Sequence, residues 1–372
     1  METTAVAAGL VLAVSLLAAF TARPMAERLP PAMAACLLAV GALALAVGTG
    51  AVLGLLVLAA AVRTPVIAAI GHESLRFMTR QDPAPLPLGI LAAALLAIAA
   101  LAAVRVAWRR GKALVTAYRA AGRLPGTGQV VVVEDTAADA YTVPGWPGRI
   151  VITSGMMRAL APREREVLLA HERAHASGRH YLFAAAVRLA AAVNPLLRPL
   201  TGAVGYALER WSDERAAREV GDRALAARAI ARAALATTVA PPVYTAPASA
   251  LGAVSSLAGR GTLDASGSAG AVREAGTVPR RVMALLRPSP RSRWLLPGTA
   301  VLLVAACALA VLAAALGLHA LVEAAQAARL HAGPLHALAQ ETQISRLHTM
   351  MATARADRLH AVMAVARGAR LR

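Results

Sequence analysis

Two histidines four residues apart, with a glutamate directly after the first, are the residues best suited to chemistry in this chain. They form the segment His171-Glu172-Arg173-Ala174-His175. On a helix, residues four apart lie on one face, so both imidazoles can bind the same Zn²⁺ ion. The carboxylate of Glu172 can then reach the open side of the metal and take a proton from water there. The spacing predicts one zinc ion per chain and hydrolysis with Glu172 as the base.

Two acidic residues further along the chain have the spacing needed to complete such a site. Glu209 and Asp213 lie four residues apart, so on a helix their carboxylates face the same way. One carboxylate could bind the metal while the other holds a ligand histidine in place. A solvated helix surface, with Glu214 and Arg218 as an exposed pair, is the alternative interpretation. The position of the two acids after the histidine motif favours the metal site.

The composition indicates a membrane protein. Apolar residues make up 58% of the 372 residues, and charged residues make up only 16%. A helix needs about 20 apolar residues to cross a bilayer. Four runs without charge reach that length, and they cover residues 3–22, 29–62, 83–104 and 294–318. The first run lacks the basic start of a signal peptide, so we interpret all four as transmembrane helices.

The net charge of +19 fits a membrane better than a nucleic acid. A nucleic-acid-binding surface should combine basic residues with aromatic rings, but aromatic residues make up only 3% of this chain. The basic residues flank the apolar runs instead. We therefore expect the lipid bilayer as a partner and no direct binding of nucleic acid. Cys36 and Cys307 lie inside apolar runs and predict neither a disulfide framework nor a cysteine-bound metal.

Basic flanks predict the orientation in the membrane, because arginine-rich loops stay on the cytoplasmic side. The region of residues 105–293 has such flanks at both ends. The basic residues are Arg105, Arg109, Arg110, Lys112, Arg119 and Arg123 at its start and Arg280, Arg281, Arg287, Arg291 and Arg293 at its end. We therefore expect a multi-pass protein of the cell membrane with a cytoplasmic catalytic region. The N-terminus and the C-terminal tail should lie outside.

The pattern between these flanks is that of an α+β domain. A small sheet is predicted by three short β-branched segments, at residues 129–134, 139–143 and 149–153. A helix with Pro162 near its first turn should then carry the histidines. Residues 181–208 are mostly apolar, with Arg188 as an exception, and the run is broken at Asn194-Pro195 and Pro199. We expect two helices there, packed over the core or dipping into the membrane interface without a full span.

The predicted fold class is a mainly α membrane protein, with four transmembrane helices and a cytoplasmic α+β domain between the third and the fourth. Residues 240–279 are rich in Ala, Gly, Ser and Pro and suggest a mobile linker. The expected parts are a three-helix membrane region, a zinc metallopeptidase core, a flexible linker with a juxtamembrane segment, a fourth transmembrane helix and an extracytoplasmic helical tail. They cover residues 1–104, 105–239, 240–293, 294–318 and 319–372.

Several segments resemble those of a known family. LAHERAH, Asn194-Pro195 after an apolar helix, and ERWSDERAA look like segments of the BlaR/MecR antirepressor-type membrane zinc metallopeptidases. They are more distantly similar to the Ste24/HtpX-like membrane proteases, whose third-ligand motif is Glu-x-x-Ala-Asp. AYTVPG, RIVITSGMMRAL and VPRRVMALL also resemble family segments. The resemblance covers about residues 105–293, together with three apolar runs before this region and one after it.

The resemblance implies a zincin-like (gluzincin) fold in which Glu209 is the third zinc ligand and Asp213 lies beside it, with Ser212 in place of the family's alanine. It implies that a substrate peptide binds along a sheet edge near residues 138–143. It also suggests a helix-turn-helix repressor as a substrate. The antirepressor sensors carry a penicillin-binding domain after the last span, where this chain has only residues 319–372, so β-lactam sensing is not implied.

Together these features predict a membrane-embedded zinc-dependent endopeptidase with a regulatory role in signal transduction. Its substrate would be a cytoplasmic or membrane-proximal protein. His171, His175 and Glu209 would bind zinc and Asp213 would support a ligand. His180, Tyr181 and Arg173 are candidates, by proximity in the sequence, for stabilising the oxyanion.

Two other functions stay open. A site-2-type intramembrane protease carries its histidines inside an apolar span, whereas charged residues such as Glu164, Glu166 and Arg173 crowd this segment. A non-catalytic membrane signalling scaffold could keep the peptidase fold, but it would have no chemical need for Glu172.

Overall fold

The computed structural model describes residues 2–61, 86–123, 128–143, 148–239, 277–288 and 350–351. The chain divides into two compact units. One consists of residues 1, 55–91 and 315–372, and the other of residues 2–54 and 92–314. The second unit contains the residues that form the candidate site.

Within the described residues, three helices are long and apolar enough to cross a membrane. They are α1 (Glu2–Arg28), α2 (Pro31–Ala61) and α5 (Leu86–Gly122). They coincide with the first three predicted runs and suggest a membrane protein. The fourth run, residues 294–318, lies outside the described residues, so a fourth transmembrane helix stays a prediction.

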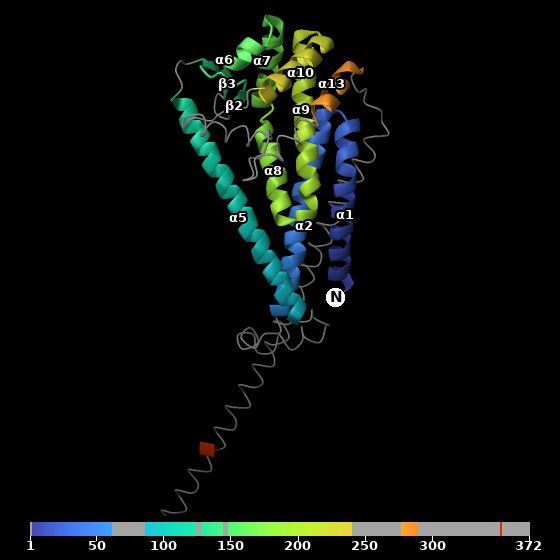
Figure 1. Cartoon of the computed structure of the whole chain (residues 1–372). Coiled ribbons are helices and arrows are strands. Elements are labelled where there is room, and N and C mark those ends of the chain that lie inside the picture. Colours follow the sequence, from blue (N-terminus) through green and yellow to red (C-terminus); the bar gives the residue numbers. More distant parts are fainter. Residues whose placement is uncertain are drawn as a thin grey trace, which may run out of the picture. The chain divides into compact units, whose positions relative to one another are not determined.

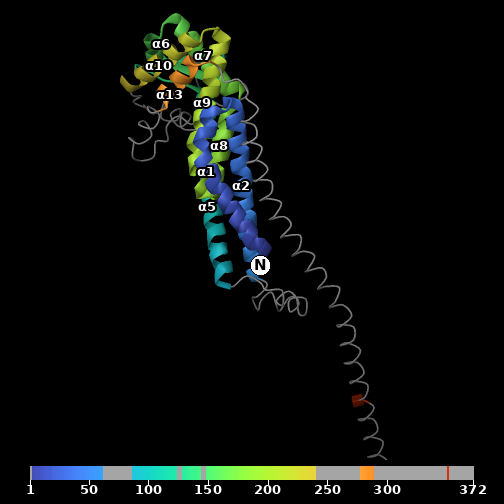
Figure 2. The ribbon, with the colours of Figure 1, turned by 90° about the vertical axis from the view of Figure 1, so that its right-hand side faces the viewer.

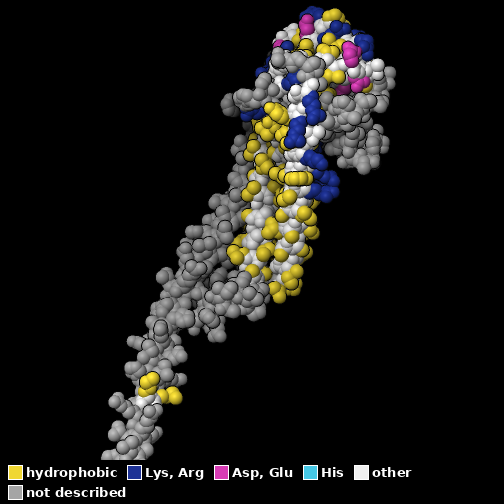
Figure 3. Space-filling model, turned by 90° about the vertical axis from the view of Figure 1, so that its left-hand side faces the viewer, with side chains coloured by type: hydrophobic (Ala, Val, Ile, Leu, Met, Phe, Trp, Pro, Cys, Tyr) yellow, Lys and Arg dark blue, Asp and Glu magenta, His cyan; other side chains and the backbone are white. Residues whose placement is uncertain are grey.

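Helix α5 continues well past the end of the third apolar run at residue 104. No proline interrupts the residues that follow, so the helix extends through the basic segment to Gly122. Its 37 residues exceed the roughly 20 that span a bilayer. Figure 3 shows hydrophobic side chains along this helix, and Lys and Arg gathered toward the end that leads to the sheet. The predicted boundary between membrane region and catalytic core therefore falls inside one helix.

A three-stranded sheet follows α5 in the chain. Its strands are β1 (Val130–Val133), β2 (Ala140–Val143) and β3 (Arg149–Thr153). The order is β1-β3-β2, with β1 parallel and β2 antiparallel to β3. Each strand lies within a segment that the sequence predicted, because β-branched residues bounded by turns leave few other conformations.

The remaining elements are, in chain order, α6 (Ser154–Ala159), α7 (Pro162–Ser177), α8 (His180–Val193), the short 3₁₀ helix η1 (Pro195–Leu197), α9 (Arg198–Val220), α10 (Arg223–Val239) and α13 (Val278–Leu286). The start of α7 is fixed by Pro162 and by the Glu164 carboxylate, which accepts a 2.9 Å hydrogen bond from the backbone N–H of Ala161. The predicted break at Asn194-Pro195 separates α8 from α9.

The two faces of the sheet are covered by different helices, because side chains along a strand alternate between faces. On one face, Tyr141 and Val151 pack against Ala117 of α5. On the other face, Ile150 and Ile152 belong to the hydrophobic cluster that α6 and α7 complete. This second face therefore places strand β2 beside the helix that carries the two histidines.

Helices α8 and α9 pack against the apolar helices α1 and α2 in one hydrophobic cluster (Figures 1 and 2). The amide of Asn194, at the turn between α8 and η1, donates hydrogen bonds to Ser15 of α1 at 3.0 Å and to Thr49 of α2 at 3.1 Å. A 14-residue helix such as α8 is too short to cross a bilayer. The hairpin formed by α8 and α9 thus lies along α1 and α2, and α8 does not itself cross the membrane.

Candidate metal centre

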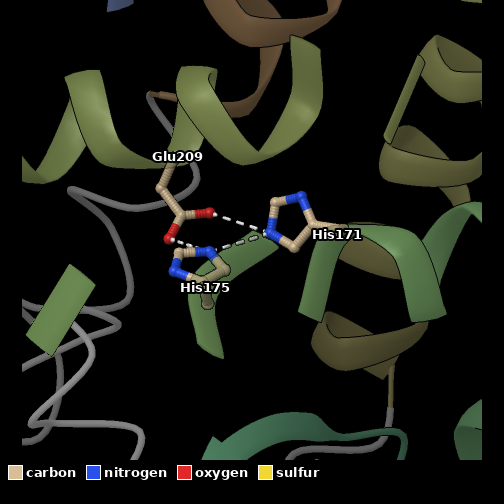
Figure 4. Close-up of side chains that lie close together, drawn as sticks. All are labelled: His171, His175 and Glu209. Carbon is tan, nitrogen blue, oxygen red and sulfur yellow. Dashed lines mark hydrogen bonds and ion pairs between the residues drawn. The ribbon is translucent and has the colours of Figure 1, made fainter. Parts of the chain in front are cut away.

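His171 and His175 lie one turn apart on α7, and both are buried. Their Nε2 atoms are 3.1 Å apart. Glu209, from α9, brings Oε2 to 3.5 Å from Nε2 of His171 and Oε1 to 3.4 Å from Nε2 of His175 (Figure 4). The three side chains each offer a ligand atom, and these atoms all lie within 4.8 Å of one another.

This arrangement fits a zinc ion. Zinc binds imidazole nitrogen and carboxylate oxygen at about 2.0–2.2 Å with tetrahedral geometry, so two of its ligand atoms lie about 3.3–3.5 Å apart. The two Nε2 atoms are 3.1 Å apart, and each lies 3.4 or 3.5 Å from the nearer oxygen of Glu209, which is close to this spacing. The two histidines contact different oxygens of Glu209, and one of these oxygens would be the third ligand atom. The remaining corner is the position that a catalytic zinc site leaves to water or substrate.

Small residues allow α7 and α9 to approach closely enough to form this site. Ala170 of α7 and Ala216 and Ala217 of α9 are buried in one cluster with residues of α10. Alanine packs without holding the two backbones apart. The packing of α7 against α9 brings Glu209 to the two histidines, and the spacing of residues along the chain alone does not fix this packing.

Asp213 contacts the ring nitrogen of His171 that points away from Glu209. Its Oδ1 lies 3.0 Å from Nδ1 of His171, and the carboxylate is almost fully buried. Burial alone would raise the pKa of Asp213, but the charge and hydrogen bonds of Arg281 and the contact with His171 lower it. The ionised carboxylate favours a proton on Nδ1 of His171, which leaves Nε2 as the ligand atom.

His171 itself holds a proton strongly when no metal is bound. Its burial lowers the pKa, but hydrogen bonds to Asp213 and Glu209, together with the two negative charges, raise it to about 9. The pocket is therefore built to hold positive charge at this position. That preference is what a Zn²⁺ site requires, because the ion replaces the proton.

Glu172 lies on α7 between the two histidines and is almost fully buried. The hydroxyl oxygen of Thr142, on β2, is 3.0 Å from Oε2 of Glu172 and 2.9 Å from the backbone oxygen of Glu172. Sequence reasoning did not single out Thr142. The available signal was a polar residue on the core-facing side of a predicted strand.

His180, at the start of α8, faces His175 across 3.1 Å between their Nδ1 atoms. Burial lowers the pKa of His180 to about 4, so it is neutral at pH 7 and can accept a hydrogen bond from Nδ1–H of His175. A side chain on Gly178 would place its Cβ 2.4 Å from Nε2 of His180, so only glycine fits there. Arg173 pairs with Glu219 at 3.3 Å. That His180, Tyr181 or Arg173 stabilises an oxyanion stays a prediction.

The alternative of a solvated charged helix for residues 209–214 does not hold. Asp213 and Glu214 are 1% and 6% exposed, and Glu209 faces the histidines. The carboxylate of Glu214 binds Arg223 of α10, with Nη2 at 2.9 Å from Oε1, whereas Arg218 donates to the backbone oxygen of Glu214. Glu209, Asp213 and Glu214 therefore point into the protein.

The comparisons with known proteins agree with this geometry. The family model "Peptidase family M48" matches residues 105–212, a region that includes both histidines, Glu172 and Glu209. No curated protein and no solved structure matches the chain. M48 peptidases are zinc metallopeptidases, and the described helices suggest a membrane protein. The match therefore supports a metallopeptidase domain of family M48 within a membrane-associated chain.

Proposed function

We propose that the chain is a membrane-embedded zinc-dependent endopeptidase. The observation that carries this proposal is the convergence of His171, His175 and Glu209, whose ligand atoms lie within 4.8 Å of one another, with the Glu172 carboxylate buried beside them. This is the set of groups that hydrolysis of a peptide bond requires.

The roles of the residues follow from their positions. When bound, zinc would supply a Lewis acid that polarises the scissile carbonyl and makes water more acidic. The carboxylate of Glu172 takes the proton of the attacking water and delivers it to the nitrogen of the leaving amine. Thr142 holds that carboxylate on the strand side, and Asp213 and His180 orient the two histidines.

Strand β2 is the candidate docking edge for the substrate. It stands at the end of the strand order, beside α7, and Thr142 connects it directly to Glu172. A peptide added alongside β2 in an extended conformation would bring its backbone past the base. This docking is in keeping with the resemblance to membrane zinc peptidases over residues 138–143.

The site lies close to the end of the first apolar helix. Arg210, the neighbour of Glu209, donates hydrogen bonds to the backbone oxygens of Ala26 at 2.8 Å and Glu27 at 3.0 Å, at the last turn of α1. This proximity supports a membrane-proximal substrate. We place the site on the cytoplasmic side because of the basic flanks at both ends of residues 105–293.

A regulatory role is proposed from the resemblance to the BlaR/MecR antirepressor-type peptidases. A helix-turn-helix repressor is accordingly the first substrate to test. A site-2-type intramembrane protease is disfavoured, because α7 is not among the three candidate spans in the described residues and carries several charged side chains.

The test compares the wild-type chain with Glu172→Gln in membranes, measuring bound zinc and cleavage of candidate proteins. We expect Glu172→Gln to keep its zinc and to lose cleavage, while Glu166→Gln, an exposed change on the same helix, keeps both. If the wild type bound zinc but cleaved no better than Glu172→Gln, the non-catalytic scaffold would be the better description. Failure of the wild type to bind zinc would remove the proposal.

A further inference from the structure

We propose that Arg281, on α13, is a positioning residue that holds the zinc ligand Glu209 and its neighbour Asp213 in place. The inference rests on the proposed zinc site. Helix α13 lies outside the region that matches the family model, which ends at residue 212. The matched region therefore includes the proposed zinc ligands but not Arg281.

The guanidinium of Arg281 contacts both carboxylates at once. Nε and Nη2 donate to Oδ2 and Oδ1 of Asp213 at 2.8 and 2.7 Å, a two-pronged contact that only an arginine can make. Nη1 lies 3.0 Å from Oε2 of Glu209. The Arg281 side chain is only 12% exposed, so this is an interior contact. One planar group therefore sets the angle between the ligand carboxylate and the carboxylate that supports His171.

Helix α13 is itself held firmly, so Arg281 is not a surface side chain that reaches the site by chance. At its N-terminal end, Arg280 donates to Glu27 of α1 at 2.8 Å and lies over the ring of Tyr206. At its C-terminal end, Arg223 of α10 donates to the backbone oxygens of residues 284, 285 and 287. Leu285 is buried in the cluster that joins α7, α9 and α10.

The positive charge of Arg281 makes the direction of its effect informative. A cation near Zn²⁺ is repelled by it, so charge alone predicts that removing Arg281 would strengthen zinc binding. Positioning predicts the opposite. Without the guanidinium, the two adjacent carboxylates would repel each other and rotate, so that Glu209 and Asp213 would leave the geometry that binds the metal. The sign of the change in zinc affinity separates the two effects.

The test measures zinc affinity by competition with a chelator, using the full-length chain purified from membranes. We expect Arg281→Gln to weaken zinc binding about 10–100-fold, the usual loss when a residue that supports a metal ligand is changed. Arg281→Lys keeps the charge but not the two-pronged contact, so its zinc affinity should lie between those of the wild type and Arg281→Gln. Arg287→Gln, at an exposed arginine directly after the end of α13, is the matched control and should bind zinc like the wild type.

A second comparison shows whether Arg281 acts through Asp213. Asp213→Asn and Arg281→Gln should not add their effects when combined, because both disturb the same contact. Equal or tighter zinc binding by Arg281→Gln would overturn the inference even if the wild type is an active peptidase. Absence of zinc binding by the wild type would instead overturn the proposed function. If Arg281→Gln fails to fold, Arg281→Lys still tests the inference, because it keeps the charge: charge alone predicts unchanged zinc binding, whereas positioning predicts weaker binding.

Discussion

The hydroxyl oxygen of Thr142 lies 3.0 Å from Oε2 of Glu172, so the side chain that we propose as the base contacts a residue of the sheet as well as its own helix. The same hydroxyl is 2.9 Å from the backbone oxygen of Glu172. Strand β2 and helix α7 are therefore joined at the side chain that we propose as the base. A peptide that docks on β2 would meet a base whose direction the strand already sets.

The first prediction concerns this contact. Thr142→Val keeps the shape of the side chain and removes its hydroxyl, so the turnover number should fall about 10–100-fold, since a hydrogen bond to a charged group contributes roughly 1.5–3 kcal/mol. Thr142→Ser should retain most of the activity. Steady-state kinetics compare the turnover numbers of the variants with that of the wild type, and the zinc content shows whether the metal is still bound. A rise in KM with no change in kcat would mean that Thr142 serves binding and not the base.

The second prediction concerns the ligands themselves. His171→Ala, His175→Ala and Glu209→Ala should each lose most of the bound zinc, because each removes one bond to the metal. Asp213→Ala should weaken zinc binding less, about 10–100-fold. Metal content per chain, measured after purification, provides the comparison. If Glu209→Ala kept its zinc while Glu219→Ala lost it, the third ligand would have been assigned to the wrong acid.

A third prediction concerns the contact between the hairpin and the apolar helices. Asn194→Ala removes the hydrogen bonds to Ser15 and Thr49, so the unfolding free energy should fall by about 1 kcal/mol, the scale of polar contacts between membrane helices. Thermal unfolding in detergent measures the change. Thr21→Ala is the control, because the Thr21 hydroxyl bonds to the backbone of its own helix. Equal shifts in both variants would show that the Asn194 contact has no special role.

The fourth prediction concerns orientation. Single cysteines in a cysteine-free background should report the side of the membrane, with Arg163 in the catalytic region and Ala332 in the tail as the two positions. Arg163 is exposed, whereas Ser154 in the same domain is buried and would label poorly. An impermeant reagent should label Ala332→Cys in intact cells and leave Arg163→Cys unmodified. Labelling of Arg163→Cys would reverse the proposed topology.

The sequence predicted those parts of the site that depend on short spacings. His171 and His175, like Glu209 and Asp213, are four residues apart, and helical geometry then decides which way they face. The three strands were predicted for a similar reason, since β-branched residues between turns are a local signal. The pairing of the two helices into one ligand set was suggested by the position of the two acids after the histidine motif and by the resemblance, because spacing along the chain does not fix contacts between helices.

The residues that sequence reasoning missed come from distant parts of the chain. Thr142 lies 30 residues before Glu172, and Arg281 lies 68 residues after Asp213. No periodic pattern links such positions. Helix α13 fell within the predicted linker and juxtamembrane segment, residues 240–293, and its role in the core depends on contacts of Leu285 and Arg223 that only the folded chain shows.

The hydrogen bonds from Arg210 to the end of α1 have a consequence for where a substrate would be cut. Glu209 and Arg210 are neighbours on one helix, so the proposed zinc site lies at a fixed distance from the end of the first apolar helix. An extended peptide advances about 3.3 Å per residue. For a membrane-anchored substrate, the number of residues between the anchor and the scissile bond would then be set by this distance. A series of substrates with lengthened or shortened stalks should move the cut through the sequence while its distance from the bilayer stays constant.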